Sequence, residues 1–155
     1  NGVPERLAFN TLPPMDDAVS GLLCRLTLMQ VLPAIREKDC EQFGKAITQI
    51  QNIVGDYFSA AQGGRYTSPF LKPILKSMTN SGATGIGQSS WGPTGFAFFP
   101  DERLAFQAMK KVREEWKSES RLRFIMSNAC NSKAKIISNN LNEQTHNENL
   151  KVTIL

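Results

Sequence analysis

The chain has 155 residues, of which 41% are hydrophobic and 21% charged, with a formal net charge of +4 at pH 7. This length suits one domain, and the ordinary composition excludes a disordered or collagen-like chain. Acidic residues interleave with the cations, so we expect no nucleic-acid partner. No stretch approaches the roughly 20 apolar residues that cross a bilayer, so we expect no membrane partner.

The cysteines and the first residues bear on the cellular compartment. Cys24, Cys40 and Cys130 are far apart in the sequence, and the N-terminus lacks the features of a secretion signal. An odd cysteine count in such a chain predicts reduced thiols and a cytoplasmic location. The chain begins without a methionine, and we expect further sequence upstream.

The first predicted element is a helix. Asp16 and Asp17 stand where a helix favours a cap and acidic first-turn residues. Pro33 lacks a backbone N–H and is expected to kink or end this helix. The apolar residues at helical spacing are Val19, Leu22, Leu23, Leu26 and Met29.

Two further helices follow. Asp39 and Gln42 resemble a capping box, with apolar residues continuing at spacings of three and four to Tyr57. Ser68 and Pro69 resemble the start of a third helix. Its predicted buried stripe is Leu71, Ile74, Leu75 and Met78.

Beyond Gly82 the hydrophobic period changes from that of a helix to that of strands. Residues 84–88 and 94–99 predict two strands, Asp101 predicts the cap of a fourth helix, and 121–128 alternates like a strand. Short strands are also possible at 133–137 and 150–155. The segment 138–148 is rich in Asn, Gln and Glu and predicts a polar tail.

This order of elements predicts an α+β fold with a mainly antiparallel sheet. The domain is expected to cover residues 1–137, with a tail or linker at 138–155.

The glycine-rich segment 82–94 is the first candidate site. Glycine lets backbone N–H groups approach an anion closely, hydroxyl groups add donors, and a Trp face can stack on a ring. The alternative is a tightly packed hairpin in which Trp91 fills the core. The candidate ligand-binding residues here are Gly85, Gly87, Gln88, Ser89, Ser90, Trp91, Gly92 and Thr94.

The second candidate segment combines Gln62, Gly63, Gly64 and Tyr66, which could bring an amide, backbone donors and a phenol to a substrate. Its alternative interpretation is an interhelical turn with Tyr66 packed against a helix. The single histidine, His146, lies in the predicted tail, so no Ser-His-Asp or Cys-His set can be assembled. We therefore assign no catalytic residue and no metal site from the sequence.

The order of several motifs resembles one known family. LMQVLPAI at residues 28–35 is followed by Phe43-Gly44 and Ile50-Gln51, by Gln62-Gly63-Gly64 with Tyr66, and by GQSSWGPT at residues 87–94. Together they are similar to the C-terminal half of the β-ribofuranosylaminobenzene 5'-phosphate synthases, a branch of the GHMP-kinase-like superfamily. The similarity runs from about residue 5 to 137.

The resemblance implies a ferredoxin-like two-layer sandwich with extra N-terminal helices, and a separate N-terminal domain with a phosphate-binding loop. It implies an enzyme that joins phosphoribosyl pyrophosphate to 4-aminobenzoate or 4-hydroxybenzoate in methanopterin-type cofactor synthesis. Pyrophosphate and carbon dioxide are released, and Mg²⁺ could accompany the pyrophosphate substrate in the full-length enzyme. No cofactor is expected in this chain, and a homodimer is possible.

Two other functional classes stay open from the sequence. One is a GHMP-type small-molecule kinase, which would more usually have small residues where this chain has Trp91. The other is a non-catalytic dimerisation or ligand-binding module. Without its N-terminal domain, the 155-residue chain is expected to be inactive.

Overall fold

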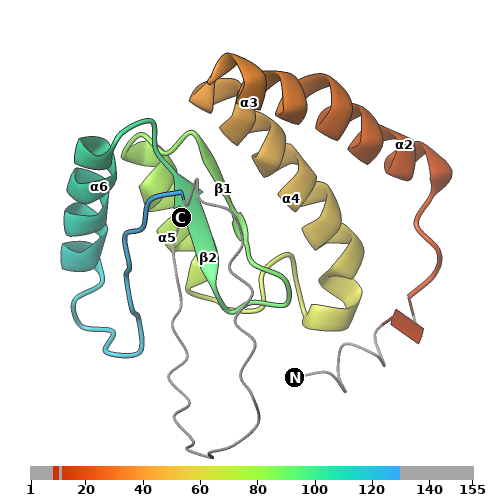
Figure 1. The fold of residues 1–155 in the computed structure, drawn as a ribbon. Coiled ribbons are helices and arrows are strands. Elements are labelled where there is room, and N and C mark those ends of the chain that lie inside the picture. Colours follow the sequence, from red (N-terminus) through yellow and green to blue (C-terminus); the bar gives the residue numbers. More distant parts are fainter. Residues whose placement is uncertain (1–8, 11, 130–155) are drawn as a thin grey trace, which may run out of the picture.

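The computed structural model describes residues 9–10 and 12–129, and in this part helices surround a small antiparallel sheet (Figure 1). An α+β class is therefore confirmed. The elements in chain order are α2 (Asp17–Leu26), a π-helical turn η1 (Thr27–Val31), α3 (Leu32–Glu37), α4 (Cys40–Gln62), α5 (Leu71–Asn80), β1 (Gly85–Gln88), β2 (Gly95–Phe98) and α6 (Glu102–Glu115).

The first helical run continues through Pro33, so the prediction that it could end there is wrong. Asp16 caps α2 by accepting a hydrogen bond of 2.8 Å from the Ala18 N–H. The α-helical hydrogen bonding changes just before the proline, where the Leu32 N–H donates to the Thr27 carbonyl. A π turn can occur inside an α-helix, so the chain resumes as α3 beyond it.

This run, Asp17–Glu37, has 21 residues and is long and apolar enough to cross a membrane by length and composition. The sequence-based statement that no stretch approaches this size is therefore corrected. Of the apolar series that predicted the helix, Leu26 is buried, whereas Leu22 is 45% and Met29 68% exposed.

Helix α4 lies along the outer edge of β1. The Asp39 carboxylate accepts a 2.9 Å hydrogen bond from the Gln42 N–H, which confirms the predicted cap. The edge N–H of Ile86 donates to the Thr48 hydroxyl at 3.0 Å. Further along α4, Gln51 Oε1 accepts a hydrogen bond of 3.0 Å from the Gln88 N–H. These side-chain acceptors replace a neighbouring strand and leave this edge of the sheet without unpaired donors there.

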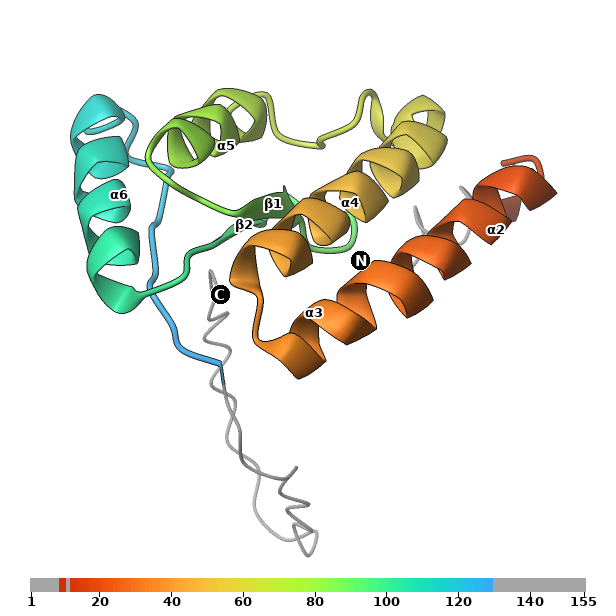
Figure 2. The same cartoon turned by 90° about the horizontal axis from the view of Figure 1, so that it is seen from above.

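The sheet consists of β1 and β2 in antiparallel register, with Gly85 opposite Phe98 and Gln88 opposite Gly95. Helices α5 and α6 pack beside it, as the view in Figure 2 shows. The core is formed by Ile74, Met78, Ala97, Ala108 and Val112. All four residues of the predicted α5 stripe are buried, and Asp101 caps α6 through the Leu104 N–H at 2.8 Å.

The predicted strand at 121–128 is absent, which corrects the sequence interpretation. Leu122 and Phe124 do pack against the core, which explains the alternating pattern. Within the described part of the chain, however, no backbone hydrogen bond joins residues 123–129 to β2. Alternation reports one-sided burial, whereas a strand also needs a neighbour at hydrogen-bonding distance.

With two strands, the ferredoxin-like arrangement is not confirmed. The short strands considered at 133–137 and 150–155, and the boundary between domain and tail at residue 137, lie outside the described residues.

Candidate functional site

A cleft of about 280 Å³ brings the two candidate segments together. It lies between the C-terminal half of α4, the loop that follows it and the β1–β2 hairpin loop. Its walls are formed by Phe9, Gln51, Val54, Gly55, Phe58, Gln62, Arg65, Tyr66, Gln88, Ser90 and Trp91.

Gln88 ties these elements to one another. Its side chain is buried, and its Oε1 accepts hydrogen bonds from the N–H and the hydroxyl of Thr67, each at 2.9 Å. Its Nε2 donates to the Ser90 carbonyl at 3.1 Å and to Gln62 Oε1 at 3.4 Å. Its backbone N–H donates to Gln51 Oε1 at 3.0 Å. With its polar atoms occupied in this way, Gln88 holds the cleft in shape and has little capacity left for a ligand.

The hairpin loop leaves two hydroxyl groups at the surface. The Ser89 N–H donates to the Thr94 carbonyl at 2.9 Å, and the Gly92 N–H donates to the Ser89 carbonyl at 2.9 Å. Ser90 has a positive φ of 50° and Gly92 one of 67°. The side chains of Ser89 and Ser90 are exposed, and neither hydroxyl has a hydrogen-bond partner among the described residues. Both hydroxyls are therefore available to a ligand.

Aromatic side chains form one wall of the cleft. The Trp91 ring meets the Phe58 ring edge-to-face with 5.3 Å between centroids, and Phe9 meets Phe58 at 5.6 Å. Trp91 is partly exposed and is not part of the core cluster around Val112. Such a wall favours a planar aromatic ligand, because rings pack well edge-to-face or offset.

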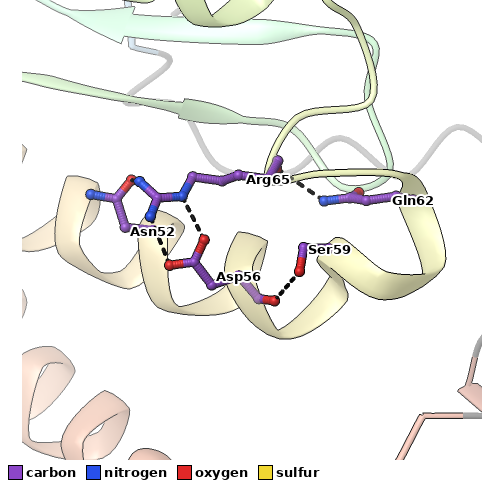
Figure 3. Close-up of polar contacts among 5 residues, drawn as sticks. All are labelled: Asn52, Asp56, Ser59, Gln62 and Arg65. Atoms are coloured by element: carbon purple, nitrogen blue, oxygen red, sulfur yellow. Dashed lines mark hydrogen bonds and ion pairs between the residues drawn. The ribbon is translucent and has the colours of Figure 1, made fainter.

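Arg65 is the one cation that lines the cleft in the described part of the chain, and it is held against α4 (Figure 3). Its Nε and one terminal nitrogen donate to the two carboxylate oxygens of Asp56, each at 2.7 Å, and the other terminal nitrogen donates to Asn52 Oδ1 at 2.8 Å. The hydrogen bond with Asp56 raises the pKa of Arg65 above its ordinary value. Gly55 leaves room for the Arg65 side chain, since a Cβ there would lie 2.7 Å from its Cγ.

Tyr66 adds a neutral hydroxyl to the cleft. Partial burial raises the pKa of Tyr66 above 10.0, although the neighbouring Arg65 opposes that shift. The phenol is therefore protonated at neutral pH and can donate a hydrogen bond to a ligand.

The structure divides the predicted site residues into three groups. Gln62, Tyr66, Gln88, Ser90 and Trp91 line the cleft. The second group shapes the backbone around it: Gly63 ends α4 in the left-handed region, and the others are Gly64, Gly87, Ser89 and Gly92.

The third group lies away from the cleft. Gly85 packs against the backbone of Gly44, and Thr94 lines a separate cavity between α5 and β2. Sequence reasoning missed Gln51, Phe58, Arg65 and Thr67. Arg65 lies inside the second candidate segment, between Gly64 and Tyr66, and its positive charge could have marked it as a site residue.

The described residues contain no group of three or more His, Cys, Asp or Glu side chains that could hold a metal ion. The expectation that Mg²⁺ could enter with a pyrophosphate substrate is not tested by this observation.

Comparison with known proteins gives two kinds of match. Residues 31–118, more than half of the chain, match the family model described as GHMP kinases C terminal. The chain is 36% identical over 75 residues to a beta-ribofuranosylphenol 5'-phosphate synthase of Methanothermobacter thermautotrophicus, which covers 48% of this chain and 22% of that protein. It is 36% identical over 84 residues to the Archaeoglobus fulgidus protein of the same name, covering 54% of this chain and 23% of the relative.

The chain thus spans less than a quarter of the length of these curated relatives. No solved structure matches it.

Proposed function

The chain belongs to the GHMP kinase family through its C-terminal domain, and we propose that it is the C-terminal part of an enzyme that joins a phosphoribosyl group to an aromatic acid. The observation that carries the proposal is the aromatic-walled cleft, into which the hydroxyl-bearing hairpin loop opens. The similarity to two proteins named as ribofuranosylphenol phosphate synthases supports it.

The aromatic acid is the substrate that this part of the protein fits. Its ring would lie against Trp91 and Phe58, and its carboxylate or ring hydroxyl would meet the hydroxyls of Ser90 and Tyr66. Because the relatives' names specify a phenol, we favour 4-hydroxybenzoate over 4-aminobenzoate. Arg65 is already engaged by Asp56, so the phosphates of phosphoribosyl pyrophosphate would be bound mainly by the N-terminal domain.

In the reaction, the bond between the ribose carbon and the pyrophosphate oxygen breaks as the ring carbon bearing the carboxylate attacks. Once the new carbon–carbon bond has formed, that ring carbon loses carbon dioxide, and the electrons of the broken bond restore the aromatic ring. We propose that the Ser89 and Ser90 hydroxyls donate hydrogen bonds to oxygens that gain charge in the transition state.

Substitution of the two serines in the full-length enzyme tests this role. Removing one donor that acts mainly in the transition state typically lowers kcat by about 100- to 1,000-fold. We expect such a loss for Ser89→Ala or Ser90→Ala, measured as pyrophosphate release with phosphoribosyl pyrophosphate and 4-hydroxybenzoate.

Ser118→Ala is the matched control, because Ser118 is exposed in the turn after α6, away from the residues that line the cleft. Full activity in both hairpin variants would disprove the proposed role of the serines. Transfer of a phosphoryl group from ATP by the wild-type enzyme, without pyrophosphate release from phosphoribosyl pyrophosphate, would instead favour a small-molecule kinase.

A further inference from the structure

One residue of the cleft carries a hydrogen-bond donor whose orientation the fold determines. Gln51 lines the cleft, and its Oε1 accepts the hydrogen bond of 3.0 Å from the Gln88 N–H. A backbone N–H can only donate, so the oxygen of the Gln51 amide must be the atom that faces β1. The NH2 group of this amide is therefore turned away from the β1 edge.

Strand β1 also holds the stem of the Gln51 side chain. A Cβ on Gly87 would lie 2.5 Å from Gln51 Cγ and 2.7 Å from its Cδ, so the missing side chain at residue 87 lets Gln51 pack directly against the strand. Among the described residues, no hydrogen bond involves Gln51 Nε2, and no buried side-chain nitrogen lacks a partner. Within this part of the chain, Nε2 is thus accessible from the cleft that Gln51 lines and can donate to a ligand.

The other donors of the cleft differ from Gln51 in charge or in freedom. Arg65 is already paired with a carboxylate. The hydroxyls of Tyr66 and Ser90 can rotate, and each can either donate or accept. The NH2 group of Gln51 can only donate, and its direction is fixed, so this end of the cleft selects a ligand group that accepts hydrogen bonds.

The face of α4 that lines the cleft leads from this polar end to the aromatic wall. Phe58 follows Gln51 by about two helical turns, roughly 10 Å along the helix axis. An aromatic acid laid along this face would place its ring against Phe58 and Trp91 and direct its carboxylate toward Gln51. The α4 residues that line the cleft are Gln51, Val54, Gly55, Phe58 and Gln62.

We propose that Gln51 recognises the carboxylate of the aromatic substrate, through a hydrogen bond from Nε2 to a carboxylate oxygen. The carboxylate is the strongest acceptor on such a substrate, because an ionised oxygen accepts stronger hydrogen bonds than a neutral one. The ring hydroxyl is then left to Tyr66 or Ser90. This assignment rests on the proposed function, which supplies the aromatic acid as the ligand.

Gln51→Glu separates recognition of the ligand from support of the fold. One carboxylate oxygen can still accept from the Gln88 N–H, whereas the other replaces the donor by an acceptor and adds a negative charge. Binding is measured by NMR titration of the 155-residue chain at about pH 8, where a glutamate is ionised. The two probes are 4-hydroxybenzoate and the neutral 4-hydroxybenzamide, whose NH2 group can donate to a glutamate.

In the wild-type chain, we expect 4-hydroxybenzoate to shift the side-chain NH2 resonances of Gln51. In Gln51→Glu the affinity for this acid should fall by about 10- to 100-fold, because a hydrogen bond to a charged group is lost and repulsion is added. The affinity for 4-hydroxybenzamide should be retained or rise, and the Tm should stay at the wild-type value.

Gln49→Glu is the matched control. Gln49 is exposed on the same helix and does not line the cleft, so the same change of charge should leave both affinities as in the wild type.

Three results would overturn the proposal. Unchanged affinity of Gln51→Glu for 4-hydroxybenzoate would show that Gln51 does not donate to the acid. An equal loss for both probes would limit Gln51 to supporting the shape of the cleft. Gln51 resonances that do not move at millimolar 4-hydroxybenzoate would show that the acid does not reach this residue. Failure of the proposed function is recognised separately, as a lack of pyrophosphate release by the wild-type full-length enzyme, which none of these binding measurements requires.

Discussion

At the scale of single residues, Gln88 differs most from its sequence interpretation. Within the glycine-rich segment its amide suggested a ligand contact, but in the structure both ends of the side chain bond to protein groups. It joins the loop after α4 to the hairpin loop, and so sets the distance between Tyr66 and Ser90. Its role is to position other residues of the cleft.

Replacing Gln88 should therefore lower stability as well as activity. In Gln88→Ala, the hydrogen bonds from the Thr67 N–H and to the Ser90 carbonyl are lost, and a typical intramolecular hydrogen bond contributes about 0.5–1.5 kcal/mol. We expect a loss of at least this size in the free energy of unfolding, measured by urea denaturation. Gln107→Ala, on the exposed face of α6, should stay within about 0.5 kcal/mol of wild type. Equal stability of the two variants would contradict the positioning role.

The residue types of the site were partly predictable. Trp91 and Ser90 stand out in the sequence because glycines surround them, and both line the cleft. Phe58 and Gln51 could not be found in this way, since each looks like an ordinary residue of an amphipathic helix. Their role comes from the approach of α4 to β1, which no local pattern contains.

At the scale of elements, α4 and β1 approach each other closely at two glycines. A Cβ on Gly44 would lie 2.6 Å from the Gly85 N, and a Cβ on Gly85 would lie 2.5 Å from the Gly44 Cα. Backbone atoms form both sides of this contact, so neither side can move away without shifting an element. The pair explains how Thr48 and Gln51 come within hydrogen-bonding distance of the β1 edge.

Gly44→Ala should consequently destabilise the protein although alanine favours helices. A helical Gly→Ala change normally gains about 0.5–1 kcal/mol, whereas overpacking costs about 1–3 kcal/mol. We expect a net loss, seen as a lower Tm. Gly21→Ala in α2 is the matched control, because a Cβ there meets nothing within 4 Å, and it should raise the Tm. A higher Tm for Gly44→Ala would show that the helix and strand separate easily.

Three helix caps and the buried stripe of α5 were the best predicted features of the elements, whereas Ser68 does not cap α5, whose N-cap is Phe70. Asp16, Asp39 and Asp101 all cap the helices expected of them, because capping depends on residues only two or three positions away. The prediction of a strand at 121–128 was wrong because strand pairing, unlike capping, depends on residues far away in the sequence. Its alternation correctly indicates that Leu122 and Phe124 face the core, but pairing depends on a distant segment.

At the scale of the whole molecule, the lining of the cleft bears on which substrate this part of the chain could bind. The cleft has aromatic walls and hydroxyl groups but lacks a free cation among the described residues, which a phosphorylated substrate would need.

The 155-residue chain should therefore bind phosphoribosyl pyrophosphate only weakly. Arg65 is held by Asp56 and Asn52, so an anion would have to compete with existing hydrogen bonds, and half a site lacks the preorganisation of the whole. We expect a Kd of about 1 mM or weaker by isothermal titration calorimetry. Asp56→Asn removes the competing charge and should tighten binding several-fold, with an effect that decreases at high salt. Asp17→Asn changes the net charge equally at the exposed start of α2 and should leave the affinity unchanged. Micromolar affinity in the wild-type chain would show that this domain alone carries the phosphate site.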